Sequence, residues 1–149
     1  MVSVNIEIDD RKVREAFKRF PDRSRANFRR ALETAGSMVE RDAKRAAPVD
    51  QGSLRQSITT RMDGMTAIVE ETTGYGKYVE FGRRPGTPPP IDRIERWAER
   101  RGIEPFVIAR HIGRFGTKAQ PFMEPSFQNN LRNIEYQMQS ALRRTLGEL

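Results

Sequence analysis

Residues 47–58 constrain the fold of this chain more than any other stretch, because they join a long helical pattern to a strand pattern through a single turn. Pro48 has no amide proton, and it disfavours a helical conformation for the residue before it. The preceding helix is therefore expected to end near Ala46 or Ala47.

The turn itself is built from residues with separate conformational tasks. Asp50 can accept a hydrogen bond from a backbone amide two residues later, and Gly52 can adopt a positive φ without steric cost. Leu54 and Ile58 then return the chain to the core. A helix stop, an Asx turn and a glycine with no nucleophile or metal ligand nearby indicate architecture rather than catalysis.

The segment before this turn predicts one strand and two helices. Residues 2–8 alternate apolar and polar side chains, the period of a half-buried strand. Residues 10–20 and about 22–47 repeat apolar residues every three or four positions, with a break at Pro21. The apolar stripe of the longer helix consists of Phe28, Leu32, Ala35, Val39, Ala43 and Ala46.

The segment after the turn predicts a hairpin and, at the end of the chain, another helix. Residues 57–62 and 66–72 have strand composition, and Asp63-Gly64 is typical of a hairpin turn. An apolar stripe running from Phe127 to about Leu146 predicts an amphipathic C-terminal helix. Together with the N-terminal strand, the hairpin would form a small antiparallel sheet with helices on one face, which is an α+β fold of two layers.

Residues 74–82, Gly-Tyr-Gly-Lys-Tyr-Val-Glu-Phe-Gly, predict one helical turn closed by Gly82. Tyr75, Tyr78 and Phe81 are spaced along one side of that turn. They could stack on nucleic-acid bases, but we favour a role in sealing the sheet edge against the helices. Glu80 does not suit a core position, and its carboxylate would fit a salt bridge or a bond to backbone amides, within or between subunits.

Residues 83–118 form an inserted segment in what we expect to be a single domain spanning residues 1–149. Its first part, residues 83–90, is rich in proline and predicts a stiff, extended excursion. Two short helices should follow, the first ending at Gly102 and the second at Gly116. The apolar residues that mark the first are Ile91, Ile94, Trp97 and Ala98, and those that mark the second are Phe106, Ala109, Ile112 and Phe115.

Charge is the strongest signal in the composition. The chain of 149 residues has a net charge of +7 and an apolar fraction of only 36%. Residues 11–47 hold twelve Lys and Arg against five Asp and Glu, and residues 83–118 hold nine against four. Such a field suits nucleic acid or an acidic partner surface. The low apolar fraction predicts either an extended shape or burial completed by partner subunits.

Residues that could carry chemistry are few. The chain has no cysteine and one histidine, His111, which excludes the usual zinc sites and leaves a serine triad without support. Glu70 with Glu71, or Asp50 with Glu80, could in principle bind magnesium, but no ligand spacing singles them out. We therefore expect no enzymatic activity and no cofactor. No apolar run approaches the roughly 20 residues of a membrane span, so we expect no membrane contact.

Three motifs, in this order, resemble the neck and tail-completion family of tailed bacteriophages, which includes the HK97-type tail component. The first is residues 47–58, where Gln51 replaces the family's usual threonine. The second is residues 78–82, Tyr-Val-Glu-Phe-Gly, and the third is residues 120–127, Gln-Pro-Phe-Met-Glu-Pro-Ser-Phe. The motif positions of interest are Pro48, Asp50, Gly52, Leu54, Ser57, Tyr78, Glu80, Phe81, Gly82, Pro121, Phe122 and Pro125.

The resemblance implies assembly rather than catalysis. Members of this family are virion proteins, made in the host cytoplasm, that join head to tail or complete the tail. A homo-oligomeric ring would follow, hexameric if it matches the tail tube, with neighbouring connector, terminator or tail-tube proteins as partners. A closed ring uses heterologous contacts, so each subunit would present two different faces.

The basic insert suggests a contact of its own. If it lines the channel, its arginines would meet phosphates of genomic DNA without reading sequence; otherwise they would reach a neighbouring subunit. These residues are Arg83, Arg84, Arg93, Arg96, Arg100 and Arg101. The main alternative function is a free-standing basic protein that binds nucleic acid non-specifically, and a second alternative is a small hydrolase with a carboxylate site.

Overall fold

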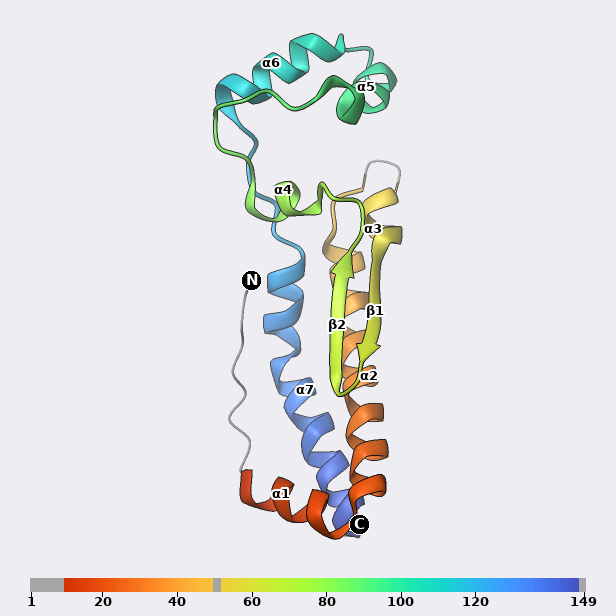
Figure 1. The fold of residues 1–149 in the computed structure, drawn as a ribbon. Coiled ribbons are helices and arrows are strands. Elements are labelled where there is room, and N and C mark those ends of the chain that lie inside the picture. The colour runs from red at the N-terminus through yellow and green to blue at the C-terminus, as the bar shows by residue number, and fades with distance from the viewer. Residues whose placement is uncertain (1–9, 50–51, 148–149) are drawn as a thin grey trace. The chain divides into compact units, whose positions relative to one another are not determined.

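The structure is a computed structural model that describes residues 10–49 and 52–147 (Figure 1). The predicted strand at residues 2–8, the turn residue Asp50 and the replaced threonine position Gln51 lie outside the described residues. The chain divides into two compact units. The first comprises residues 1–73 and 122–149, which we call the helix–hairpin unit, and the second comprises residues 74–121, which we call the insert unit.

Helices dominate the described residues, with one antiparallel hairpin, and the predicted α+β class is confirmed. The helix–hairpin unit contains α1 (Asp10–Arg19), α2 (Pro21–Ala46), α3 (Ser53–Ser57), β1 (Ile58–Asp63), β2 (Thr66–Glu71) and α7 (Met123–Leu146). The insert unit contains α4 (Gly76–Phe81), α5 (Ile91–Arg100) and α6 (Pro105–Phe115).

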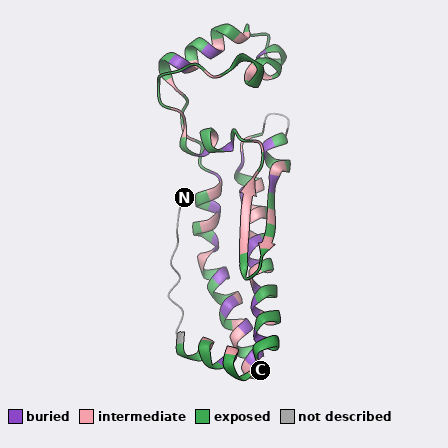
Figure 2. Ribbon diagram, viewed as in Figure 1, coloured by how far each residue is buried: buried purple, intermediate pink, exposed green. Residues whose placement is uncertain are grey.

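The core of the helix–hairpin unit lies between α2 and α7, which run antiparallel beside each other (Figure 1). Both helices follow the predicted apolar stripes, and Figure 2 shows their buried residues along the sides that face each other. One cluster contains Phe28, Ala31, Met138 and Ala141, and a second contains Ala35, Val39 and Ile134. Of the predicted stripe, only Ala46 is exposed, because the next residue, Ala47, takes the buried position at the helix end.

Two polar contacts join the same pair of helices. Nδ2 of Asn130 on α7 donates to Oδ2 of Asp42 on α2 at 2.8 Å, and Nδ2 of Asn27 on α2 donates to Oγ1 of Thr145 on α7 at 3.1 Å. The pKa of Asp42 lies below its ordinary value because Arg41 donates a hydrogen bond to the carboxylate, to which Asn130 adds a second. These contacts place polar side chains within a helix interface that is otherwise apolar.

The hairpin packs on α2, with β1 and β2 paired antiparallel from Ile58 with Glu71 to Asp63 with Thr66. The turn consists of Gly64 and Met65, one residue later than predicted. The backbone of α2 approaches β1 closely at Gly36, where an added Cβ would lie 2.6 Å from Cγ2 of Thr60. A side chain larger than hydrogen at residue 36 would therefore press on the hairpin.

The turn after α2 behaves as its sequence predicts up to Pro48. The helix ends at Ala46, and Ala47 adopts an extended conformation (φ −59°, ψ 129°), as expected before a proline. Gly52 has a φ of 79°, in the left-handed region. The structure then differs from the expectation, since α3 forms a single helical turn before β1, beginning with a bond from the amide of Gln56 to the carbonyl of Gly52 at 2.8 Å.

The two ends of the inserted segment, residues 83–118, are joined by backbone hydrogen bonds. Arg83 and Thr117 exchange two bonds, of 3.0 and 2.8 Å, and the amide of Gly86 donates to the carbonyl of Gly113 at 2.7 Å. Residues 83–90 otherwise contain no helix or strand, as predicted. The first insert helix, α5, ends at Arg100, two residues before the predicted Gly102, and α6 ends at Phe115, directly before the predicted Gly116. The two helices are in contact, and their buried residues are Ala98, Ala109 and Gly113.

Candidate assembly surface

The first sequence motif has a structural role within the helix–hairpin unit. Leu54 and Ile58 are buried, as expected, and Oγ of Ser57 donates to the carbonyl of Leu54 at 2.8 Å at the end of α3. Pro48 is half-buried directly after the helix end. This motif therefore shapes the passage from α2 to β1 and exposes no reactive group among its described residues.

The second motif inverts the expected pattern of burial. Glu80 on α4 is 6% exposed, whereas Phe81 is 65% exposed and Tyr78 and Tyr75 are also exposed. The interpretation that these three aromatic residues seal a sheet edge is therefore wrong for the single chain. The reason is that α4 is only six residues long and presents the aromatic side of its turn to solvent.

Gly82 is required by the geometry that follows α4. Its φ is 70°, and an added Cβ would lie 2.6 Å from the carbonyl oxygen of Thr117 and 2.8 Å from the amide nitrogen of Ala119. The amide of Gln120 also donates to the carbonyl of Val79 at 2.8 Å. The second motif and the start of the third are thus joined within the insert unit.

The rest of the third motif opens α7. Phe122 is 1% exposed and is the largest of the fully buried side chains among the described residues, while Pro121 and Pro125 are exposed. Oγ of Ser126 donates to the carbonyl of Phe122 at 2.6 Å. The buried phenylalanine anchors the start of the helix.

The predicted basic residues of the insert remain at its surface, and some of them pack on aromatic rings. Arg83 lies over Tyr78 and donates to the carbonyl of Thr87 at 2.6 Å, and Arg101 lies over Trp97 with its guanidinium carbon 4.6 Å from the ring centroid. The other four, Arg84, Arg93, Arg96 and Arg100, are exposed.

Several apolar side chains of the insert that the sequence predicts to be buried are exposed. Phe106 and Phe115, which we expected to mark the buried stripe of α6, are 56% and 59% exposed, and Val107 is exposed beside them. Arg110 lies over Phe106 and Arg114 over Phe115. The signal was present, because the consecutive apolar residues 106–109 cannot all face one core from a helix.

Other classes of site have little support. The single histidine, His111, is exposed, with its ring centroid 4.8 Å from that of Phe115. Across residues 10–49 and 52–147, no group of three or more His, Cys, Asp or Glu residues is placed to hold a metal ion. Within the same ranges, no helix combines the length and apolar character needed to cross a bilayer.

Comparison with known proteins yields one match. Residues 11–82 match a family model described as "Bacteriophage HK97-gp10, putative tail-component", which covers just under half of the chain. No curated protein and no solved structure matches the chain. The matched residues contain α1, α2, the hairpin and α4, and with them the first two of the three motifs. The resemblance to an HK97-type phage tail component is thereby confirmed over residues 11–82.

Proposed function

We propose that this chain is a non-enzymatic structural subunit of a phage neck or tail that assembles into a ring, joining head to tail or completing the tail. The ring has six copies where it meets a sixfold tail tube, and its partners are the adjoining connector, terminator or tail-tube proteins. The family match over residues 11–82 supports a location in the virion.

The proposal rests on the exposed apolar side chains of the insert unit. The buried residues of α5 and α6 are Ala98, Ala109 and Gly113, while the large side chains of Phe81, Phe106 and Phe115 are exposed. Exposed apolar side chains that gather into one patch mark interaction sites. We assign these residues to the contact with a neighbouring subunit.

The residues around these aromatics also suit a protein interface. Arginine and aromatic residues are enriched in interface centres, where they supply much of the binding energy. Arg110 over Phe106 and Arg114 over Phe115 provide this combination on α6. The backbone hydrogen bonds between Arg83 and Thr117 join the two ends of the inserted segment. This surface therefore requires little ordering on assembly.

The experiment is native mass spectrometry of the purified chain at high concentration. We expect closed oligomers for the natural sequence and their loss in the double variant Phe106→Ser and Phe115→Ser. Tyr136→Ser is the matched control, since Tyr136 on α7 is 60% exposed but lies outside the insert unit. Oligomers that survive the double variant, or that Tyr136→Ser disrupts equally, would remove the support for this surface.

The insert arginines form a separate part of the proposal, as contacts to a neighbouring subunit or to DNA in the channel. Arg84 is the more informative residue to test, because Arg83 already donates a hydrogen bond to the carbonyl of Thr87 within its own loop. Arg84→Ala combined with Arg96→Ala should reduce particle assembly or DNA retention. Normal infectious particles from that double variant would count against the role of these arginines.

A further inference from the structure

A second basic surface lies on the helix–hairpin unit, where α1, the start of α2 and the end of α7 come together (Figure 1). We define this basic end as residues 10–25 and 142–146. It carries nine cationic side chains, all exposed, against three acidic residues in the same segments. The nine are Arg11, Lys12, Arg14, Lys18, Arg19, Arg23, Arg25, Arg143 and Arg144.

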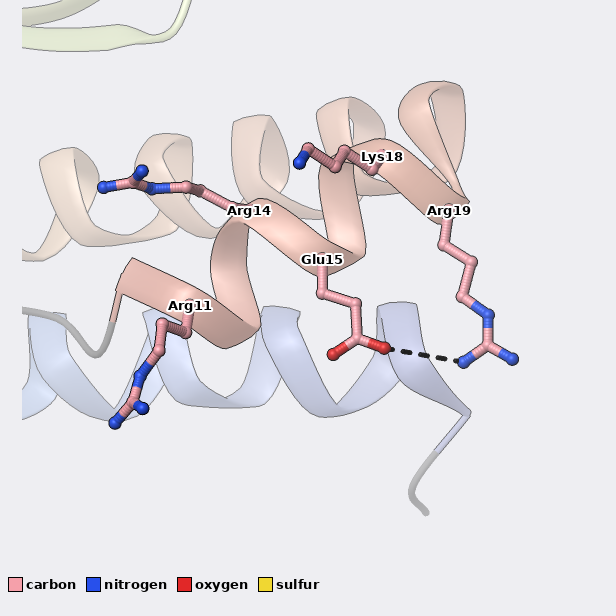
Figure 3. Close-up of a pocket in the computed structure, with 5 residues that line it drawn as sticks. All are labelled: Arg11, Arg14, Glu15, Lys18 and Arg19. Carbon is pink, nitrogen blue, oxygen red and sulfur yellow. Dashed lines mark ion pairs between the residues drawn. The ribbon is translucent and has the colours of Figure 1, made fainter.

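The side chains of α1 surround a shallow hollow that is lined by four cations and one carboxylate. These are Arg11, Arg14, Glu15, Lys18 and Arg19. In Figure 3, Arg14 and Lys18 extend from one side of α1, while Glu15 turns toward Arg19, with which it forms an ion pair of 3.8 Å. Within the hollow, Glu15 is therefore paired with Arg19.

The helix that carries these cations is held in place from its other side. Ala16 is fully buried, and its carbonyl accepts a hydrogen bond of 2.7 Å from Oγ of Ser24 on α2. The ring of Phe17 packs on Phe28 with 5.4 Å between centroids. The cations of α1 are therefore displayed from a fixed helix, and a ligand need not order the backbone to bind them.

One pair of cations on α1 is spaced so that its charges repel. Arg14 and Lys18 lie four residues apart on α1, a separation at which like charges repel. The exposed arginines at the end of α7 add further positive charge close to α1. A polyanion would relieve this repulsion, whereas an uncharged partner would not.

Exposed apolar side chains distinguish a surface that binds a membrane or a protein from one that binds a nucleic acid. None of the described residues of the basic end is among the exposed large hydrophobic side chains. A helix that binds a membrane surface needs an exposed apolar face, and a protein interface needs an apolar centre. Nucleic-acid backbones, in contrast, are bound largely through cationic contacts to phosphates. We propose that the basic end binds the phosphate backbone of a nucleic acid without reading its sequence.

This site is distinct from the insert surface and does not depend on ring formation. The test uses the full chain and fluorescent 25-base-pair duplexes of two unrelated sequences. The variant combines Arg11→Gln, Arg14→Gln and Lys18→Gln, which keep helix-compatible side chains. The charge-matched control combines Arg45→Gln, Arg55→Gln and Arg132→Gln, which are exposed residues of the same unit outside the basic end.

The natural chain should bind both duplexes with similar affinity and a steep dependence on salt. The basic-end variant should bind at least about tenfold more weakly at 50 mM salt, with a salt slope shallower by roughly 2 to 3, since each lost phosphate contact removes about 0.9. Added DNA should raise the melting temperature of this variant less than that of the natural chain.

Three results would overturn the proposal. The first is an equal loss of binding in the control variant and the basic-end variant, which would make net charge the cause. The second is no binding of DNA by the natural chain at 50 mM salt. The third is binding of the natural chain to vesicles containing phosphatidylserine but not to DNA, which would assign the surface to a membrane.

Discussion

Asn130 on α7 and Asp42 on α2 are joined by a hydrogen bond of 2.8 Å between Nδ2 and Oδ2, although 88 residues separate them in sequence. Asn130 is 1% exposed. The bond from Asn27 to Thr145 lies fifteen residues away along each of the two helices. The two bonds share one antiparallel register, so together they oppose sliding of α7 along α2.

Removing the buried amide should weaken the helix pair. We expect Asn130→Ala to lower the free energy of unfolding by about 2 kcal/mol, because a hydrogen bond to a charged group contributes about 1.5–3 kcal/mol. Urea denaturation followed by circular dichroism measures this change. Asn133→Ala is the control, since Asn133 is exposed and donates only a longer bond, 3.3 Å, to Asn130. Equal losses in the two variants would contradict a special role for Asn130.

Acid should weaken the same region through two carboxylates on α2. The pKa of Glu40 is lowered from its ordinary value of 4.5, chiefly by a hydrogen bond from Lys44, and that of Asp42 is lowered from 3.8. A carboxyl whose pKa is lower when folded stabilises the fold above its unfolded pKa, and this stabilisation is lost as pH falls through the folded value. Stability should therefore begin to decrease below about pH 4.5.

The pH effect is tested by urea denaturation between pH 6 and pH 3. In the double variant Glu40→Gln and Asp42→Asn, the free energy of unfolding should change less over this range than in the natural chain. Asp92→Asn, which removes an exposed carboxylate on α5 in the insert unit, is the control. A double variant with the same pH profile as the natural chain would show that these two groups do not contribute.

A methyl group at Gly36 should push the hairpin away from α2. The added Cβ would lie 2.6 Å from Cγ2 of Thr60, and overpacking of this kind costs about 1–3 kcal/mol. Gly36→Ala should therefore lower the melting temperature, even though alanine favours a helix more than glycine does. Thr60→Ser removes Cγ2, so the double variant should recover most of the lost stability. Failure of Thr60→Ser to rescue Gly36→Ala would place the cause elsewhere.

Gly82→Ala should weaken the contact between the two ends of the inserted segment, residues 83–118. The substitution combines a positive φ with a clash against the Thr117 carbonyl, next to the bonds that join Arg83 and Thr117. Hydrogen exchange at the amides of residues 83 and 117 should accelerate at least about tenfold, which corresponds to about 1.4 kcal/mol. Gly102→Ala is the matched control, because Gly102 also has a positive φ (66°) but no atom within 4 Å of an added Cβ. Similar acceleration in both variants would attribute the effect to φ alone.

Much of the helical framework was predictable from local rules. Pro48 indicated the end of α2, and Gly116 indicated the end of α6, whereas α5 ends two residues before Gly102. The apolar stripes identified the facing sides of α2 and α7. These features depend on neighbours within a few residues, which a sequence displays directly. The short helix α3 was missed, because a single turn of five residues carries too little periodicity to recognise.

The polar contacts of the core were not predictable in the same way. Asn130 and Thr145 would be assigned to a solvent face by their chemistry, and only the pairing of α2 with α7 brings each to its partner. The predicted burial of the exposed aromatic residues was wrong for a different reason. Periodicity marks Phe106 and Phe115 as residues to be buried but does not tell whether the same chain or another chain buries them.

The central claim, a structural subunit of a phage neck or tail, is tested most directly by counting this chain in purified particles of the phage that encodes it. Quantitative mass spectrometry against the major tail protein provides that count. We predict a fixed number of copies per particle, six for a single hexameric ring, and a loss of tailed particles when Phe106 and Phe115 are both replaced by serine. Particles that lack the chain and still infect normally would contradict the proposed function.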